Sequence, residues 1–105
     1  MDVVYRLSGI SFVWDRRKAQ TNLQKHGIAF ETACEIFFDP FVRLIETEVV
    51  SGEEREAAVG MTSDWRLLKV IYVFRPEAVR IISARPITLR ERKTYEEQGI
   101  AGASP

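Results

Sequence analysis

Residues 79–95 of this 105-residue chain read VRIISARPITLRERKTY, and they decide the fold that the rest of the sequence completes. The first half alternates its side chains with a period of two, which predicts a β-strand over 79–85. Pro86 lacks the N–H that a strand pairing needs and ends the strand. Thr88 and Glu91 then have the spacing of a capping box, which begins a helix. A strand therefore passes directly into a helix.

This strand–helix junction is rich in cations. Between residues 80 and 93 the basic residues are Arg80, Arg85, Arg90, Arg92 and Lys93, and the single acid is Glu91. Cations held on a strand and on the helix that follows it share one rigid frame, which favours phosphate binding. A regular strand would point Arg80 and Arg85 to opposite faces. Both reach one site only if a bulge or the end of the strand redirects Arg85.

A second polar group lies on a helix near the N-terminus. After a short predicted strand over 10–14, Asp15 is a good N-cap for a helix over 16–26, and Gly27 is typical of a helix end. At 100° per residue, one stripe of this helix is polar and lies beside the apolar face. The stripe consists of Lys18, Asn22 and Lys25, with His26 at its border.

The remaining chain predicts a second helix and a sheet. Apolar residues with helical spacing precede a break at Asp39–Pro40; they are Phe30, Ala33, Cys34 and Phe37. Strands are predicted over 41–48, 55–61 and 67–74, and the last helix runs to about residue 98. The predicted order is β-α-α-β-β-β-β-α. This is an α+β fold with a small antiparallel sheet, two N-terminal helices and one C-terminal helix.

Length and composition predict a single domain over residues 1–105. Within it we expect a loosely ordered leader over 1–9 and a loosely ordered tail over 99–105. Cys34 is the only cysteine and belongs to an apolar helix face, so we expect a packed thiol in a reducing compartment. No stretch approaches the ~18 apolar residues of a membrane span, and no signal peptide is recognisable. We therefore expect a soluble cytoplasmic protein without membrane contact.

The net charge of zero conceals charges that are segregated along the chain. The net charge is +3 over residues 1–29, −7 over 30–65, +6 over 66–93 and −2 from Thr94 onward. If the two basic segments meet in space, they form a positive face that suits a nucleic acid or an acidic partner. The alternative is that these charges pair with one another across the sheet and the helices.

The sequence contains no metal-binding or nucleotide-binding motif, so we expect no metal and no cofactor. What remains is a set of cations with a few groups that can exchange protons. Metal-free RNA cleavage needs little more than these. A base takes the proton of the ribose 2′-hydroxyl, an acid protonates the leaving 5′-oxygen, and cations stabilise the negative phosphorane.

Each candidate residue also has a structural interpretation. For Arg85 function is favoured, because neither core nor sheet explains an arginine at the strand end, although a surface ion pair is the alternative. Arg55 lies among glutamates, so a solvated salt bridge is as reasonable as a role in function. His26 is of the residue type that exchanges protons near neutral pH, but it also stabilises a helix end. Glu91 is explained by the capping box, and Tyr95 by packing on the sheet.

The motifs together are more specific than any one of them. The pattern Trp14-Asp15-x-x-Lys18-x-x-x-Asn22-x-x-Lys25-His26-Gly27-x-x-Phe30-x-x-Ala33, followed by Phe37 and Asp39, resembles the N-terminal signature of the BrnT family. The pair Glu54-Arg55 with Gly60, the run Arg80–Arg85 and the motif Glu91-Arg92-x-x-Tyr95 are similar to the later landmarks of that family. The resemblance extends from Phe12 to about Glu97.

This resemblance implies a type II toxin with a RelE-like fold, a ribonuclease that blocks translation. It also implies a BrnA-type ribbon-helix-helix antitoxin, an oligomeric toxin–antitoxin complex, and autoregulation on operator DNA that is contacted through the antitoxin. Carried over by position, the catalytic candidates are Arg85, Arg55, Arg80, His26, Glu54 and Tyr95. The substrate-binding candidates are Lys25, Lys18, Asn22, Glu91 and Arg92.

Two residues depart from the family pattern. Arg16 stands where we expect an acidic residue, which changes surface charge, and Pro86 stands where a basic residue is frequent, which removes one cation from the junction. An alternative function also stays open, because the set of acid–base groups is sparse and the net charge is zero. In it the chain is a non-catalytic module that binds nucleic acid or an acidic protein, or a co-repressor that acts together with its partner.

Overall fold

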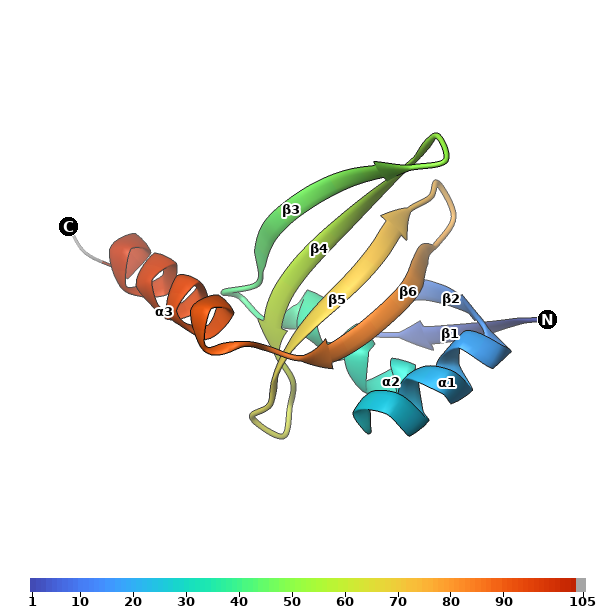
Figure 1. The fold of residues 1–105 in the computed structure, drawn as a ribbon, viewed down its shortest axis with the longest axis horizontal. Helices are drawn as coiled ribbons and strands as arrows, with labels where there is room; N and C mark the ends of the chain where they lie inside the picture. Colours follow the sequence, from blue (N-terminus) through green and yellow to red (C-terminus); the bar gives the residue numbers. More distant parts are fainter. Residues whose placement is uncertain (104–105) are drawn as a thin grey trace.

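The fold is a six-stranded sheet with short helices on one face and a longer helix at the C-terminal end (Figure 1). The computed structural model describes residues 1–103. In chain order the elements are β1 (Asp2–Leu7), β2 (Ile10–Asp15), α1 (Arg16–His26), α2 (Phe30–Ala33), the 3₁₀ helix η1 (Cys34–Phe38), β3 (Arg43–Val50), β4 (Glu53–Met61), β5 (Leu67–Phe74), β6 (Val79–Pro86) and α3 (Leu89–Ala103). No helix in the described chain is long and apolar enough to cross a membrane.

Strand β6 joins the two halves of the sheet. The strand order is β1-β2-β6-β5-β4-β3, so β6 lies between the N-terminal hairpin and the other strands. Its pairing with β5 is antiparallel, whereas its pairing with β2 is parallel and short. In the parallel pairing Phe12 lies opposite Val79 and Val13 lies opposite Arg80. The hairpin is thus attached to the β3–β6 meander at one end of β6.

Helix α1 follows the edge of β6 beyond this short pairing. The side chain of Asn22 accepts a hydrogen bond from the backbone N–H of Ala84 at 3.0 Å and donates one to the carbonyl oxygen of Ile28 at 3.0 Å. Asn22 is only 6% exposed. Its amide therefore satisfies two buried backbone groups and ties α1 and the following turn to the strand.

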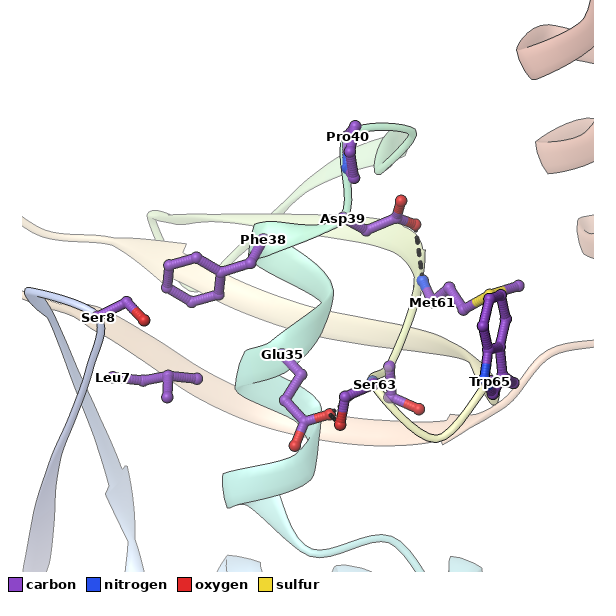
Figure 2. A pocket seen from close by; sticks show the side chains of 10 residues that line it. Leu7, Ser8, Glu35, Phe38, Asp39, Pro40, Met61, Ser63 and Trp65 are labelled. Carbon is purple, nitrogen blue, oxygen red and sulfur yellow. Dashed lines mark hydrogen bonds between the residues drawn. The ribbon is translucent and has the colours of Figure 1, made fainter.

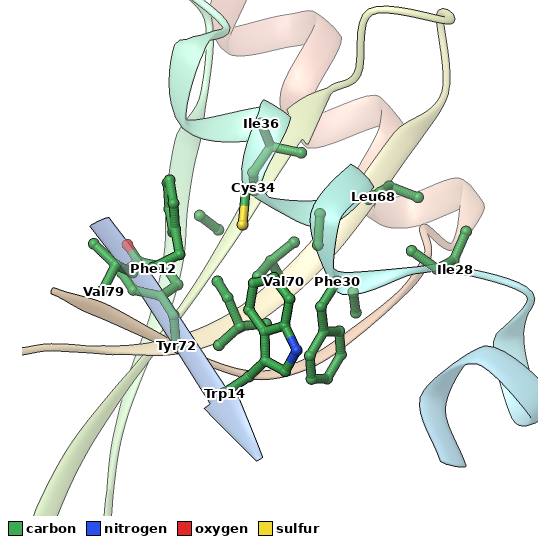
Figure 3. Close-up of a cluster of buried hydrophobic side chains, with 14 residues drawn as sticks. Phe12, Trp14, Ile28, Phe30, Cys34, Ile36, Leu68, Val70, Tyr72 and Val79 are labelled. Atoms are coloured by element: carbon green, nitrogen blue, oxygen red, sulfur yellow. The ribbon is translucent and has the colours of Figure 1, made fainter. Parts of the chain in front are cut away.

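The hydrophobic core lies between one face of the sheet and the segment α2–η1 (Figure 3). Trp14 of β2 packs edge-to-face on Phe30 of α2, with ring centroids 5.7 Å apart. Cys34 is fully buried in this core, which confirms the predicted packed thiol, and burial raises the pKa of that thiol. Gly60 of β4 lies so close to η1 that an added Cβ would be 2.7 Å from the Cβ of Ile36.

The α+β class is confirmed, but three details of the prediction are wrong. The sheet is mixed rather than antiparallel, because β2 and β6 are parallel. The predicted second helix is only the single turn α2, and it continues as η1. Finally, an additional strand precedes the predicted first one, so the order begins with two strands.

That additional strand is formed by the residues that we expected to be a loose leader. All of β1 pairs antiparallel with β2. Alternate side chains of β1 pack against the core; they are Val3, Tyr5 and Leu7. Ser8 and Gly9 make the connecting turn with positive φ angles of 48° and 83°. Such a two-residue turn is a hairpin signal, and here it marks residues 1–9 as structured.

The C-terminal helix also departs from the prediction. A capping box begins it as expected, with the N–H of Thr88 donating to Glu91 at 2.9 Å and the N–H of Glu91 donating to the Thr88 hydroxyl at 3.2 Å. The helix continues to Ala103 instead of ending near residue 98. The expected loose tail is therefore helical over 99–103, and residues 104–105 lie outside the described residues.

Candidate functional site

A bulge in β6 brings Arg80 and Arg85 to the same face of the sheet. Along the regular strand β5, Val73 and Lys69 point to one face; Arg80 lies opposite Val73, and Arg85 lies opposite Lys69. The register shifts between these two pairs, and Ile82 is the additional residue in β6. Both arginines therefore lie on the face turned away from α1, α2 and η1, which we call the outer face. Of the two predicted possibilities, the bulge is the one observed.

Arg85 holds a carboxylate in a two-point contact. Its guanidinium donates to both carboxylate oxygens of Glu91, at 2.9 and 2.8 Å. These hydrogen bonds lower the pKa of Glu91 to about 2, and the N–H of Thr88 and the charge of Lys69 act in the same direction. The same contact raises the pKa of Arg85. Glu91 is thus both the capping-box residue and the ion-pair partner of the main candidate.

Lys69 completes this group, and the sequence prediction missed it. Its side chain is 13% exposed, with Nζ 2.8 Å from Glu46 and 3.8 Å from Glu91. It is the only charged residue in the apolar strand β5, which is the signal that identifies it in the sequence. Lysine is rarely buried in a protein core, so core packing does not explain a lysine at this position.

The two other predicted arginines share the outer face and also have acidic partners. The guanidinium of Arg80 donates to both oxygens of Asp2, at 3.0 and 3.1 Å. Arg55 has its Nε 3.5 Å from Glu53, which fits the salt-bridge interpretation. Glu54, next to Arg55 in β4, points to the opposite face. The structure therefore separates Glu54 from the arginines.

The polar stripe of α1 lies elsewhere and forms its own groove. A hollow of about 320 Å³ lies between α1 and β6, and its lining includes Lys18, Lys25, His26 and Ser83. Within the described residues no carboxylate lies within salt-bridge distance of Lys18 or Lys25. The groove is therefore an open basic surface. Asn22 also borders it, but both ends of its amide are occupied by the backbone.

The last two candidates are on α3. The hydroxyl of Tyr95 donates to Asp39 at 2.6 Å, and both burial and this carboxylate raise the pKa of Tyr95. Asp39 also accepts from the backbone N–H groups of Met61 and Phe41, at 2.8 and 2.9 Å, so it anchors α3 to the end of β4. Arg92 forms an exposed pair with Glu96 at 3.0 Å. Tyr95 therefore attaches α3 to the end of β4, whereas Arg92 forms its ion pair within α3.

The candidate residues were predicted from the sequence to form one site, whereas the structure distributes them over separate groups. The outer face holds Arg55, Arg80, Arg85 and Glu91, to which the structure adds Lys69. The α1 groove holds Lys18, Lys25 and His26. Nowhere in residues 1–103 do three or more His, Cys, Asp or Glu side chains gather as a metal site. What the outer face offers chemically is the binding of an oxyanion between an arginine fork and a lysine.

Comparison with known proteins places these residues in a family context. A family model described as the ribonuclease toxin BrnT of type II toxin–antitoxin systems matches residues 14–91. That range includes Arg55, Arg80, Arg85 and Glu91 and ends before Arg92 and Tyr95. The crystal structure of the Brucella abortus ribonuclease toxin BrnT is similar, with a TM-score of 0.58 and 28% identity over 71% of this chain and 92% of that chain. No curated protein sequence matches the chain.

Proposed function

Because the chain belongs to the family of BrnT ribonuclease toxins of type II toxin–antitoxin systems, we propose that it is a metal-independent endoribonuclease whose outer face binds the scissile phosphate. In this proposal it acts in the cytoplasm, cleaves RNA so that translation stops, and is neutralised by a BrnA-type ribbon-helix-helix antitoxin. The resulting oligomeric complex contacts operator DNA through the antitoxin.

The observation that carries this proposal is the shared face of Arg80, Arg85 and Lys69. The fork of Arg85 already binds two carboxylate oxygens of Glu91, and the same geometry fits two oxygens of a phosphodiester. Lys69 lies beside it as a second charge, opposite Arg85 in the β5–β6 pairing. Negative charge that develops on the phosphorane would be stabilised by cations that are already in place.

In the proposed reaction, the ribose 2′-hydroxyl attacks the adjacent phosphorus and the bond to the 5′-oxygen breaks. The 5′-oxygen takes a proton from water, which leaves a cyclic phosphate and a 5′-hydroxyl. Glu46 is the carboxylate best placed to take the 2′-hydroxyl proton, since it is exposed and lies 2.8 Å from Lys69. Tyr95 is less suited to proton transfer than predicted, because Asp39 holds its hydroxyl. Arg55 and Arg80 would bind flanking phosphates, and the α1 groove with Lys18, Lys25 and His26 would bind the RNA chain further away.

The decisive experiment measures cleavage of a fluorescent single-stranded RNA by the purified chain in the presence of EDTA. We expect cleavage by the wild type and a loss of about 10²–10³-fold in Arg85→Ala, the range found when one transition-state contact is removed. Arg16→Ala is the matched control, because Arg16 is an exposed arginine at the start of α1, on the opposite face of the sheet, and does not line the α1 groove. A folded Arg85→Ala that cleaves at the wild-type rate would contradict the proposal.

One observation favours the alternative of a non-catalytic binding module. Each outer-face cation described above has an acidic partner in the free protein, so RNA must compete with Asp2, Glu46, Glu53 and Glu91. Wild-type protein that binds RNA with a steep salt dependence but leaves it intact would establish this alternative.

A further inference from the structure

A pocket of about 430 Å³, which none of the outer-face cations lines, lies at the end of the sheet where η1 meets two hairpin turns (Figure 2). Its walls come from the β1–β2 turn, from η1 with the residues just after it, and from the β4–β5 turn. The apolar lining includes Leu7, Phe38, Met61 and Trp65. We call it the Trp65 pocket. The proposed function makes no use of it.

The β4–β5 turn holds Trp65 in a fixed and unusual position. Its backbone has φ +66°, a left-handed conformation that a bulky side chain rarely adopts. The turn is pinned on both sides: the N–H of Thr62 donates to the carbonyl of Arg66 at 2.8 Å, and Glu35 of η1 accepts from both the N–H and the hydroxyl of Ser63 at 2.8 Å. Nevertheless the tryptophan residue is 83% exposed. A strained backbone that presents an uncovered aromatic ring is typical of a recognition site.

The charge of the pocket distinguishes between possible ligands. The charged residues in its lining are Glu35 and Asp39, and the hydrogen bonds that their carboxylates accept come from uncharged donors: Ser63 for Glu35, and Tyr95 with the backbone of Phe41 and Met61 for Asp39. Eight of the ten lining residues belong to the segment 30–65, whose net charge is −7. Phosphate groups would be repelled here, so an RNA strand is a poor occupant. A protein segment that carries an apolar side chain and flanking cations is complementary to it.

We propose that the Trp65 pocket is the surface on which the antitoxin docks, with an apolar anchor of the antitoxin in the pocket and its basic residues beside Glu35 and Asp39. This inference rests on the proposed function for the nature of the partner. Tryptophan is the side chain most enriched among residues that dominate protein–protein binding, and a rigid turn lets it bind without a large loss of conformational freedom. Neither Arg80 nor Arg85 lines the pocket, so another part of the antitoxin can cover Arg85 when the anchor docks there.

The test is a calorimetric titration of the purified toxin with its purified cognate antitoxin. Trp65→Gly removes the ring and also relieves the left-handed backbone, so a loss of binding would not come from unfolding. We expect the affinity to fall at least tenfold in Trp65→Gly, whereas Trp65→Phe keeps most of it. Leu89→Ala is the matched control, because Leu89 is also 83% exposed but lies on α3 away from the pocket. Glu35→Gln should weaken binding at low salt more than at high salt.

RNA cleavage by the same preparations separates the two proposals. If Trp65→Gly loses antitoxin affinity while the wild type fails to cleave RNA, the docking surface stands and the ribonuclease mechanism falls. If Trp65→Gly binds the antitoxin like the wild type, or if the wild type does not bind it, the docking surface is refuted whatever the cleavage result. If Trp65→Gly loses RNA binding but keeps its antitoxin affinity, the docking surface is also refuted. The pocket would then be assigned to a nucleobase of the RNA.

Discussion

Arg85 and Glu91 are joined by two parallel hydrogen bonds of 2.9 and 2.8 Å, across the junction between β6 and α3. The residue proposed to bind phosphate is therefore also the residue that fixes the first turn of the last helix. If Arg85 binds phosphate as proposed, stability and activity are coupled at this contact, because the phosphate must share the guanidinium with Glu91 or displace Glu91 from it.

The ion pair between Arg85 and Glu91 should make the free energy of unfolding depend on pH. The folded-state pKa of Glu91 is lowered to about 2, below the ordinary value of 4.5. The stabilisation that ionised Glu91 gives to the folded state is thus fully present above pH 4.5 and is lost as the pH falls toward 2. The shift corresponds to about 3 kcal/mol, which solvent screening reduces to about 1–2 kcal/mol. Urea unfolding at pH 6 and pH 3 should show this loss in the wild type, and Glu91→Gln should show a smaller one. Equal losses in both proteins would exclude Glu91 as the source.

Releasing Arg80 from Asp2 should strengthen RNA binding. Asp2→Asn removes the carboxylate that accepts two hydrogen bonds from Arg80. If the freed arginine contacts one more phosphate, the slope of log K against log salt should steepen by about 0.7 for a single strand. Fluorescence anisotropy at several salt concentrations measures this slope.

Glu77→Gln is the control for that experiment. It changes the net charge by the same amount, but Glu77 has no ion-pair partner in the described chain. Equal steepening in both variants would mean that overall charge, rather than Arg80, governs the binding.

Asn22 and Lys25 are neighbours on α1 and should respond differently to substitution by alanine. Asn22→Ala leaves the N–H of Ala84 and the carbonyl of Ile28 without their partner, so we expect a loss of about 1–3 kcal/mol in unfolding free energy. Lys25→Ala should change stability by no more than about 0.5 kcal/mol, since Lys25 is exposed. Chemical denaturation measures both. A larger loss of unfolding free energy in Lys25→Ala than in Asn22→Ala would contradict the structural role given to Asn22.

Gly60 should not tolerate even a methyl group. In Gly60→Ala the new Cβ would lie 2.7 Å from Ile36 Cβ and 3.0 Å from the Ile36 carbonyl oxygen, so η1 would have to move away from β4. We expect a destabilisation of about 1–3 kcal/mol, measured as a lower midpoint of thermal unfolding. Ala58→Gly in the same strand is a useful comparison, because it removes a methyl group from the core rather than adding one. An unchanged midpoint in Gly60→Ala would show that η1 is free to shift.

The sequence predicted those parts of the fold that depend on local pattern. The β6–α3 junction, the α1 caps at Asp15 and Gly27 and the buried Cys34 all follow from signals within a few residues. The parallel pairing of β2 with β6 depends on contacts between distant parts of the chain, which periodicity does not report. The same holds for the bulge at Ile82, which decides that Arg80 and Arg85 share a face.

The candidate site was predicted as one cluster because the basic residues were read from two segments without their relative orientation. Arg85 and Arg80 do share a face, but the α1 residues line a separate groove. Lys69 was missed because an apolar run was interpreted as core, although its side chain points to the outer face. The alternation of side chains along β5 was the available signal for Lys69. It shows which face Lys69 shares with Arg85 only when the register of β5 against β6 is known.

The position of β6 also has a consequence for the time course of folding. β6 is the strand that the hairpin β1–β2 pairs with, and it lies more than sixty residues further along the chain. During synthesis from the N-terminus, the hairpin therefore waits for its partner strand while more than sixty further residues are made. The same strand carries Arg80 and Arg85, so the nascent chain completes its sheet and acquires its proposed phosphate-binding arginines in one late step.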